Sequence, residues 1–298
     1  MAFPLRYVLP YDEAMSDLSD VLAVLDLKET GEGRFEAGSL DEGMGTVVFG
    51  GQLLAQALVA ASRVIPDKQA LSMHMVFARG ATAAEPLEIA VDTMQAGRAF
   101  GSVTVTTSQG GKVCTRAVVL LHTPDDDLIR HADSAPAVAP AGELPAREGG
   151  SPWWEIRFAD GADFADPDAV GPPELRVWTR FPGAPDDVTV DQALLAYASD
   201  GFLIGTAMRP HPGKGQSLAH VSISTTVLAQ TLSFHEPFSA ADWLLLDQRS
   251  SYAGRGRTQG HGSVFTADGR LVASFDQVNM VRDFPAGQAP KPGERAAR

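Results

Sequence analysis

Residues 50–64 read GGQLLAQALVAASRV, and this segment is the starting point for the fold. After its two glycines, the apolar residues recur at the spacing of a helix, which predicts a helix over residues 53–64. Four strand-like runs follow at residues 70–77, 87–94, 100–108 and 112–122, and Gly110-Gly111 predicts a hairpin between the last two. One helix followed by antiparallel strands is typical of a helix wrapped by a curved sheet.

The second half of the chain repeats this order. Asp191 is the expected N-cap of a helix over residues 191–200. Strand-like runs follow at residues 220–234, 243–250, 257–265 and 270–281, and a turn at Asp268-Gly269 precedes the last of them. The same plan, one helix and then a series of strands, therefore occurs twice.

The two halves can also be placed in register. Phe77 corresponds to Phe234 and Leu87 to Leu244, each 157 positions later, and the triplet at residues 96–98 recurs at residues 253–255. At the final hairpin the offset is 158, whereas the helices align at an offset of 140, so the second half carries an insertion after its helix. Nearly constant offsets across several strands indicate a duplication.

Composition divides the chain into segments. We expect an N-terminal domain over residues 1–123, a linker rich in Pro, Ala and acidic residues over 124–173, and a C-terminal domain over 174–284. The adjacent Trp153 and Trp154 indicate that part of this linker docks against the sheets. The Pro/Gly/Ala-rich tail over residues 285–298 is expected to be disordered.

Charge and cysteine content exclude several classes of function. The net charge of −13 and the lack of a Lys/Arg cluster argue against nucleic acid as a partner. We find no signal peptide and no membrane span, so we expect no membrane association and a cytoplasmic location. Cys114 is the single cysteine, which excludes an intramolecular disulfide and a cysteine-based zinc site, and its alternating apolar context favours a core position over a nucleophilic role.

Short stretches in a fixed order carry a family resemblance. They are FGGQ at residues 49–52, HMVFARG at 74–80, LLAYASD at 194–200, FHEPF at 234–238, WLL at 243–245, DGRLVAS at 268–274, and Gln277. In order and spacing the chain resembles the type II acyl-CoA thioesterases. The resemblance implies an α+β fold of two tandem hot-dog domains, in which a curved antiparallel sheet wraps each helix and the sheets form one continuous double hot-dog.

The resemblance also implies an activity and its residues. Members of this family hydrolyse acyl-CoA with a directly activated water, without a covalent intermediate, a metal or another cofactor. They use an Asp near the end of the second helix, a Thr or Ser on the next strand, and a Gln on the last strand. The Asp corresponds to Asp200 and the Gln to Gln277, whereas the hydroxyl position falls on Val227. Thr225 and Thr226, just before it, are the candidates for that role.

The duplication tests the Asp and Gln independently. Asp200 corresponds to Ala60 by the helix offset, and Gln277 to Val119 by the late strand offset. A polar pair at positions that the fold can fill with apolar residues costs on the order of 1–3 kcal/mol for each group left unpaired. The asymmetry therefore predicts one working site in the chain, in which Asp200 accepts a proton or hydrogen bond from water and Gln277 orients that water.

Further residues are candidates for substrate binding. Gly50 and Gly51 can offer backbone N–H groups to an oxyanion, because they open the first helix, although a tight helix start explains them equally well. Val227 and His74 are candidate substrate contacts, and for His74 and His235 structural hydrogen bonding is the favoured interpretation.

Two other hypotheses remain open. A hot-dog enoyl-thioester hydratase needs an acid/base pair such as Asp with His, and neither repeat-related position holds a His. A non-catalytic protein that binds acyl-CoA or another acyl ligand is the second alternative, since Val227 replaces the hydroxyl residue. In either case the open sheet edge and outer face predict association into a homo-oligomer.

Overall fold

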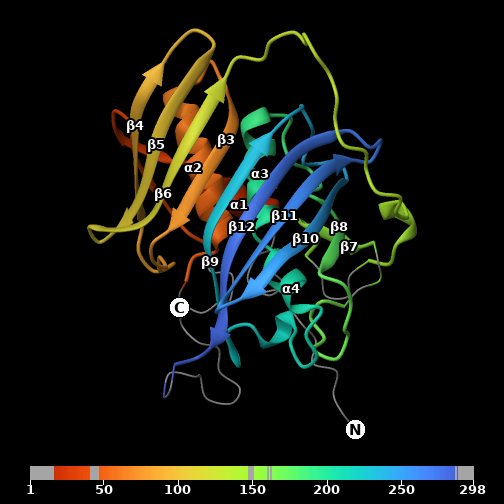
Figure 1. Cartoon of the computed structure of the whole chain (residues 1–298). Coiled ribbons are helices and arrows are strands. Elements are labelled where there is room, and N and C mark those ends of the chain that lie inside the picture. The colour runs from red at the N-terminus through yellow and green to blue at the C-terminus, as the bar shows by residue number, and fades with distance from the viewer. Residues whose placement is uncertain are drawn as a thin grey trace.

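The computed structural model describes residues 17–40, 47–146, 151–159, 161, 163–285 and 287. Its strands form one sheet of 12 strands in the order β1-β2-β4-β5-β6-β3-β9-β12-β11-β10-β8-β7. Every neighbouring pair is antiparallel. Figure 1 shows the two halves of the sheet curving away from each other, with the longer helices behind them.

The first half of the chain supplies one end of this sheet and its helices. Its elements are α1 (Leu18–Leu25), β1 (Lys28–Gly31), β2 (Arg34–Ala37), α2 (Gly50–Val64), β3 (Gln69–Phe77), β4 (Leu87–Ala96), β5 (Phe100–Gln109) and β6 (Lys112–His122). The four predicted strands of this half are confirmed to within two residues at each end, because period-two alternation and Gly-containing turns are local signals.

The second half supplies the other end. Its elements are β7 (Glu155–Phe158), β8 (Glu174–Arg180), α3 (Val188–Ser199), α4 (Leu203–Met208), β9 (Ile223–Phe234), β10 (Leu244–Gly254), β11 (Arg257–Thr266) and β12 (Leu271–Asp283). Short 3-10 helices lie at Ala141–Glu143 and Gln216–Leu218. The predicted insertion after the second helix contains α4, which packs against β10 and β11.

Strand register confirms the duplication. Glu88 pairs with Ser108 in the first half, and their counterparts 157 positions later, Leu245 and Phe265, pair in the second. The halves join where β3 pairs with β9, and at that junction His74 lies directly opposite its own counterpart, Thr231. The sheet is therefore continuous across an approximate two-fold axis.

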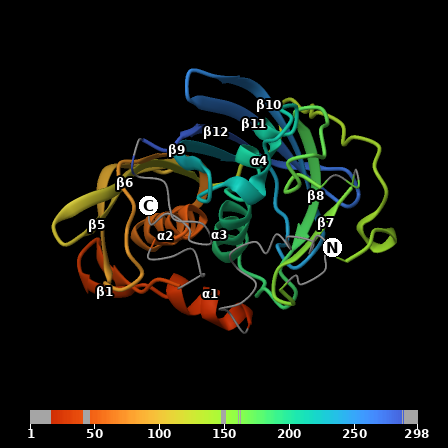
Figure 2. The ribbon, with the colours of Figure 1, turned by 90° about the horizontal axis from the view of Figure 1, so that it is seen from below.

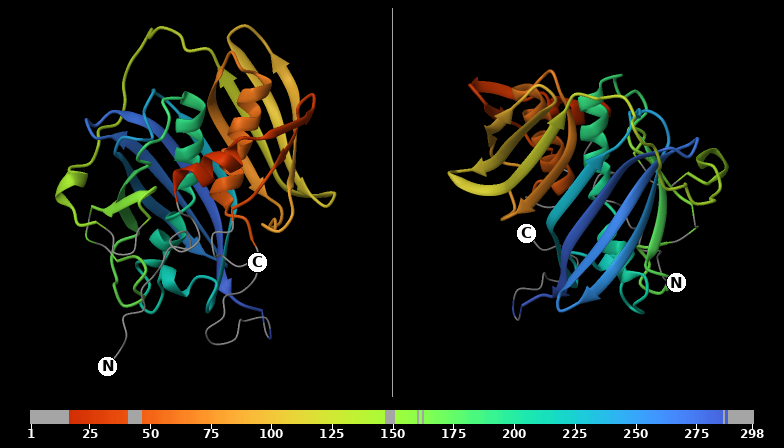
Figure 3. Two further views of the ribbon diagram at one scale, coloured as in Figure 1. Left: turned by 180° about the vertical axis from the view of Figure 1, so that it is seen from behind. Right: turned by 45° about the horizontal axis from the view of Figure 1, so that its top comes forward.

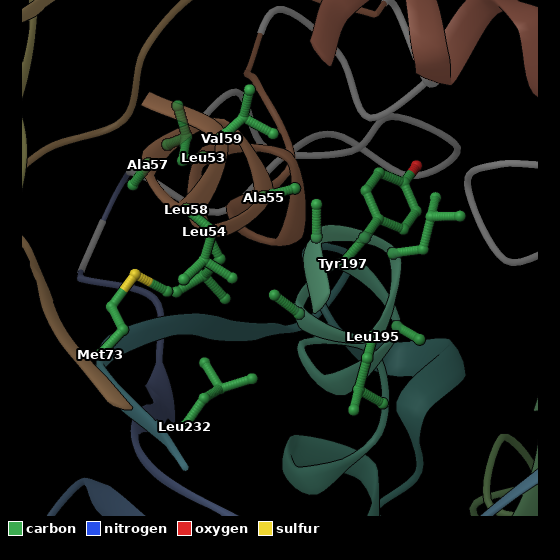
Figure 4. Packing of buried hydrophobic residues seen from close by; sticks show 14 of the residues in the cluster. Leu53, Leu54, Ala55, Ala57, Leu58, Val59, Met73, Leu195, Tyr197 and Leu232 are labelled. Carbon is green, nitrogen blue, oxygen red and sulfur yellow. The ribbon is translucent and has the colours of Figure 1, made fainter. Parts of the chain in front are cut away.

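The two long helices, α2 and α3, lie side by side on one face of the sheet (Figure 2). Residues 51–62 of α2 and 191–199 of α3 are all buried, because each helix contacts the other as well as the sheet. In Figure 4, Met73 of β3 and Leu232 of β9 point toward the apolar side chains of the helices. Complete burial of such a side chain contributes about 2 kcal/mol to folding. This arrangement is the predicted double hot-dog.

The start of α3 differs from the prediction. The helix begins at Val188, and its N-cap is Asp187, whose carboxylate accepts a hydrogen bond of 3.0 Å from the backbone N–H of Val190. Asp191 instead lies in the first turn and is buried, and it accepts a bond of 2.7 Å from the backbone N–H of Ala240. The predicted N-cap is therefore wrong. Any aspartate can cap a helix, so residue type does not distinguish Asp187 from Asp191.

The predicted linker is partly structured. Residues 155–158 form the edge strand β7, which pairs with β8, and Figure 3 shows the segment after β6 crossing to that edge. Trp153 and Trp154 are buried, and the Trp154 ring stacks on Phe181 at 5.7 Å between centroids. The tail predicted to be disordered lies outside the described residues, apart from positions 285 and 287. None of the helices in the described ranges is both long and apolar enough to span a bilayer.

Asp191 predicts a pH dependence of stability. Burial is the main cause that raises the pKa of its carboxyl to about 6. The unfolded chain ionises this group near pH 4, so the folded state binds more protons between about pH 4 and pH 6 and its stability falls as pH rises through that window. At about 1.4 kcal/mol per pKa unit, the loss is on the order of 1–3 kcal/mol.

The Asp191→Asn variant tests this dependence. Asparagine keeps an acceptor for the Ala240 N–H but carries no charge, so the variant should be more stable than the parent chain at about pH 7. The difference should shrink toward about pH 4. Urea unfolding at both pH values measures it, and an equal difference at the two would contradict the assignment to this carboxyl.

Candidate active site

A cavity of about 400 Å³ lies between the two halves. The start of α2 and the end of β3 form one side of it, and the end of α3 with the facing parts of β9 and β12 forms the other. Its wall is mainly apolar, with Asp200 the one carboxylate among the described residues that line it. The lining residues are Val47, Val48, Gly50, Leu53, Phe77, Ala78, Arg79, Gly80, Asp200, His220, Ser224, Thr225, Thr226, Val227, Leu228, Met280, Arg282, Phe284 and Pro285.

Asp200 is the C-cap residue of α3 and is buried. Its Oδ1 atom accepts a hydrogen bond of 3.0 Å from Gln277 Nε2. Its Oδ2 atom lies against the first residue of α2, so close that a Cβ atom on Gly50 would stand 2.7 Å from it. The carboxylate thus bridges the two halves and faces the N-terminus of α2, where the helix dipole favours a negative charge.

Gln277 reaches Asp200 from within the core. It is fully buried, whereas Asp276 beside it is exposed, as strand alternation predicts. Gln277 Nε2 donates to Asp200 and also to Gln230 Oε1, at 2.8 Å. Gln277 Oε1 has no hydrogen-bond partner among the described residues. Gln277 does not line the cavity and meets it through Asp200.

The candidates on β9 all line the cavity. Thr225 is buried, and its Oγ1 lies 3.1 Å from Nε2 of His220. Thr226 is half-buried and its hydroxyl donates to the backbone carbonyl of Val227 at 3.4 Å. Val227 packs in an apolar cluster with residues of α4. The structure therefore brings Thr225, Thr226 and Val227 to the cavity that holds Asp200.

The two glycines of α2 have different surroundings. Gly50 lines the cavity beside Asp200. Gly51 is buried and is not a lining residue; a Cβ atom there would collide with the Phe49 ring and the backbone carbonyl of Tyr197. Close packing of α2 on α3 therefore requires the glycine at position 51.

His74 does not line this cavity. It lies on the exposed face of β3, opposite Met73 and Met75, because successive side chains of a strand point to opposite faces. Its Nδ1 atom is 2.8 Å from Thr231 Oγ1 across the junction of the two halves. His235 Nε2 is likewise 3.0 Å from Ser274 Oγ. Both histidines therefore lie at hydrogen-bond distance from a hydroxyl, as the structural interpretation expects, and His74 is not among the residues that line the cavity.

Three residues near Asp200 escaped the sequence analysis. Gln230 on β9 and Ser199 on α3 are buried and linked by a hydrogen bond of 2.6 Å from Gln230 Nε2 to Ser199 Oγ. His220 lines the cavity from a loop, with a positive φ of 63°. The offset of 157 pairs Gln230 with Met73, so comparison of every strand position between the halves would have found it.

Within the described ranges, no group of three or more His, Cys, Asp or Glu side chains is arranged to hold a metal ion. Cys114 is buried, and burial raises the pKa of its thiol, which disfavours the nucleophilic thiolate. The polar side chains at the cavity include the carboxylate of Asp200, with the Gln277 amide behind it, the hydroxyl of Thr225 and the imidazole of His220.

Comparison with known proteins identifies the family of both halves. Residues 40–122 match the family model of the acyl-CoA thioesterase N-terminal domain, and residues 131–281 match that of the C-terminal domain. Acyl-CoA thioesterase 2 of Haemophilus influenzae is 30% identical over 290 residues, covering 90% of this chain and 99% of that protein. Human acyl-coenzyme A thioesterase 8 is 28% identical, covering 80% of this chain and 81% of that protein.

A solved structure shares this architecture over most of the chain. The crystal structure of the acyl-CoA thioesterase II TesB2 from Mycobacterium marinum superposes with a TM-score of 0.76 at 30% identity, covering 90% of this chain and 99% of that one. Both halves of the chain match the family in sequence, and the fold matches that of a solved acyl-CoA thioesterase. The chain therefore belongs to the acyl-CoA thioesterase family and is a thioester hydrolase of the double hot-dog fold.

Proposed function

We propose that this thioesterase cleaves acyl-CoA with a water molecule held by Asp200 and Gln277. The observation that carries the proposal is the buried hydrogen bond of 3.0 Å between these side chains at the wall of the cavity. Their counterparts in the first half, Ala60 and Val119, are buried and apolar. The fold does not need polar groups at these positions. Their presence in one half only therefore supports a catalytic role for them.

In this mechanism Asp200 takes a proton from the water as the water oxygen attacks the thioester carbonyl carbon. We place this water in the wall of the cavity beside Asp200, where its second hydrogen can bond to Gln277 Oε1, a buried acceptor without a partner among the described residues. The C–S bond then breaks, and the sulfur leaves as the thiolate of CoA, which takes the proton from Asp200 and so restores the carboxylate. The N-terminus of α2 at Gly50 faces the same cavity and supplies backbone N–H groups to the carbonyl oxygen as it becomes negative.

The shape and charge of the cavity suit an acyl-CoA. Apolar residues from both halves, including Leu53, Phe77 and Met280, provide a surface for the acyl group. Two exposed arginines, Arg79 and Arg282, line the same cavity, and guanidinium groups bind phosphate through paired hydrogen bonds. The chain has a net charge of −13, so positive side chains at the cavity stand out. We therefore infer that Arg79 and Arg282 contact the phosphates of CoA at the rim of the cavity.

Release of free thiol from a panel of acyl-CoAs tests the proposal. We expect turnover on at least one member of a series from acetyl-CoA to palmitoyl-CoA, with the preferred length set by the apolar wall. Crotonyl-CoA separates hydrolysis from hydration, because hydration removes the enoyl absorbance without releasing thiol. Measurable binding without thiol release on any substrate would instead support a binding protein.

A further inference from the structure

A buried chain of hydrogen bonds runs from α3 to the carboxylate of Asp200. Ser199 Oγ donates to the backbone carbonyl of Ala196 at 2.8 Å, and it accepts from Gln230 Nε2 at 2.6 Å. Gln230 Oε1 accepts from Gln277 Nε2 at 2.8 Å, and the same Nε2 donates to Asp200 at 3.0 Å. Both amides and the hydroxyl are buried, so water does not compete for these bonds.

The direction of every bond in this chain follows from its first member. The carbonyl of Ala196 can only accept a hydrogen bond, so the Ser199 hydroxyl donates its one hydrogen to that carbonyl. Toward Gln230 the Ser199 hydroxyl can then only accept. Gln230 must then present its NH₂ group to Ser199 and its oxygen to Gln277. Gln277 consequently presents its NH₂ group to Gln230 and Asp200, and its oxygen is left as an acceptor. The hydrogen bond from Ser199 to the Ala196 carbonyl, which we call the anchor, therefore fixes the orientation of the Gln230 and Gln277 amides.

The first half of the chain, which lacks an equivalent of Asp200, shows which residues the fold has at the positions of Gln230 and Ser199. Gln230 corresponds to Met73 at the offset of 157, and Ser199 corresponds to Val59 at the helix offset of 140. Met73 pairs across the strands with Val119, just as Gln230 pairs with Gln277. Both apolar counterparts are buried in the core. The polar side chains are thus a feature of the half that holds Asp200, and the architecture does not require them.

We propose that Gln230, anchored by Ser199, is a positioning residue that holds the Gln277 amide with its N–H toward Asp200 and its oxygen free to accept. This inference rests on the proposed function of Asp200 and Gln277. Neither Gln230 nor Ser199 lines the cavity, so both act through Gln277.

The anchor matters most during turnover. An ionised Asp200 by itself favours the N–H of Gln277, because a carboxylate only accepts. Once Asp200 has taken the proton of the water, that preference disappears, and the Gln277 amide could rotate so that its oxygen and NH₂ group exchange places. Gln230 keeps the amide in place in both states, because its own orientation depends on a backbone carbonyl that does not titrate.

The Gln230→Met variant tests the proposal, since it recreates the first-half counterpart Met73 and removes the acceptor for Gln277. We expect kcat to fall on the order of tenfold with KM within about twofold of the parent value. Leu232→Met is the matched control, because Leu232 is buried on the same strand and face but belongs to the apolar core. It should leave both constants unchanged, and an equal loss of kcat in the control would overturn the proposal.

Measurement of kcat in the Gln277→Ala background separates positioning from a general packing effect. If Gln230 acts through Gln277, the Gln230→Met change should cost less than about twofold there. Ser199→Ala removes the anchor with a smaller change in volume and should lower kcat severalfold, again only while Gln277 is present. Independent, multiplicative losses would refute the positioning role. Turnover insensitive to Gln277→Ala itself would instead refute the proposed function.

Discussion

The Asp200→Asn enzyme is expected to lose at least about a hundredfold in kcat, the usual contribution of a general base. Asparagine has the shape of aspartate, and its Oδ1 still accepts the hydrogen bond from Gln277 Nε2. The amide cannot take a proton from water, and it places an NH₂ group against the start of α2 where Oδ2 stood. Because packing changes little, we expect the folded structure and KM to be retained. Thiol release at saturating acyl-CoA measures the loss.

Asp191→Asn is the matched control for this experiment. Asp191 is also a buried aspartate of α3, but it lies in the first turn of the helix and bonds to the backbone of Ala240. Its substitution should alter stability and leave kcat unchanged. If Asp200→Asn retains the turnover of the parent enzyme, the base lies elsewhere, and His220 in the same cavity becomes the first residue to replace.

The Gln277→Ala variant is expected to lower kcat by on the order of a hundredfold. The change leaves Asp200 Oδ1 and Gln230 Oε1 without the donor they share, and it removes the proposed second acceptor for water. Loss of buried hydrogen bonds and of side-chain volume should also cost about 2–4 kcal/mol of stability. Thiol release and urea unfolding on the same preparation measure both effects.

Gln277→Val separates these two effects. Valine is the residue at the corresponding buried position of the first half, Val119, so the strand accommodates it and the cavity left is smaller than with alanine. We expect the valine enzyme to be more stable than the alanine enzyme while its kcat is equally low. A valine enzyme with the turnover of the parent would contradict a catalytic role for the amide.

The strands and their order were predictable from the sequence, whereas several flanking elements were not. Runs such as residues 112–122 alternate clearly and are bounded by turns, so local pattern is sufficient. The short strands β1, β2 and β7 have four residues each, too few for a period to be recognised. The strand β7 also follows a Pro-rich segment, and only its pairing with β8 makes it a strand.

The site was predictable in part. Asp200 and Gln277 stand out because the duplication supplies an apolar counterpart for each. The same comparison singles out Gln230, although nothing in a linear sequence says that residues 199, 230 and 277 meet. His74 belongs to a family motif, but the motif does not show that this side chain lies on the exposed face of β3, away from the residues that line the cavity.

The sequence by itself determined the duplication, the alignment of the two halves and the asymmetry between them, because these depend on local periodicity and on comparison of the chain with itself. Tertiary structure decided which aspartate caps α3, which face His74 occupies, and that Ser199 and Gln230 stand behind Gln277. Each of these depends on contacts between residues far apart in the chain. The role of a buried polar side chain depends on its hydrogen-bond partner, and only the folded structure shows which residue that partner is.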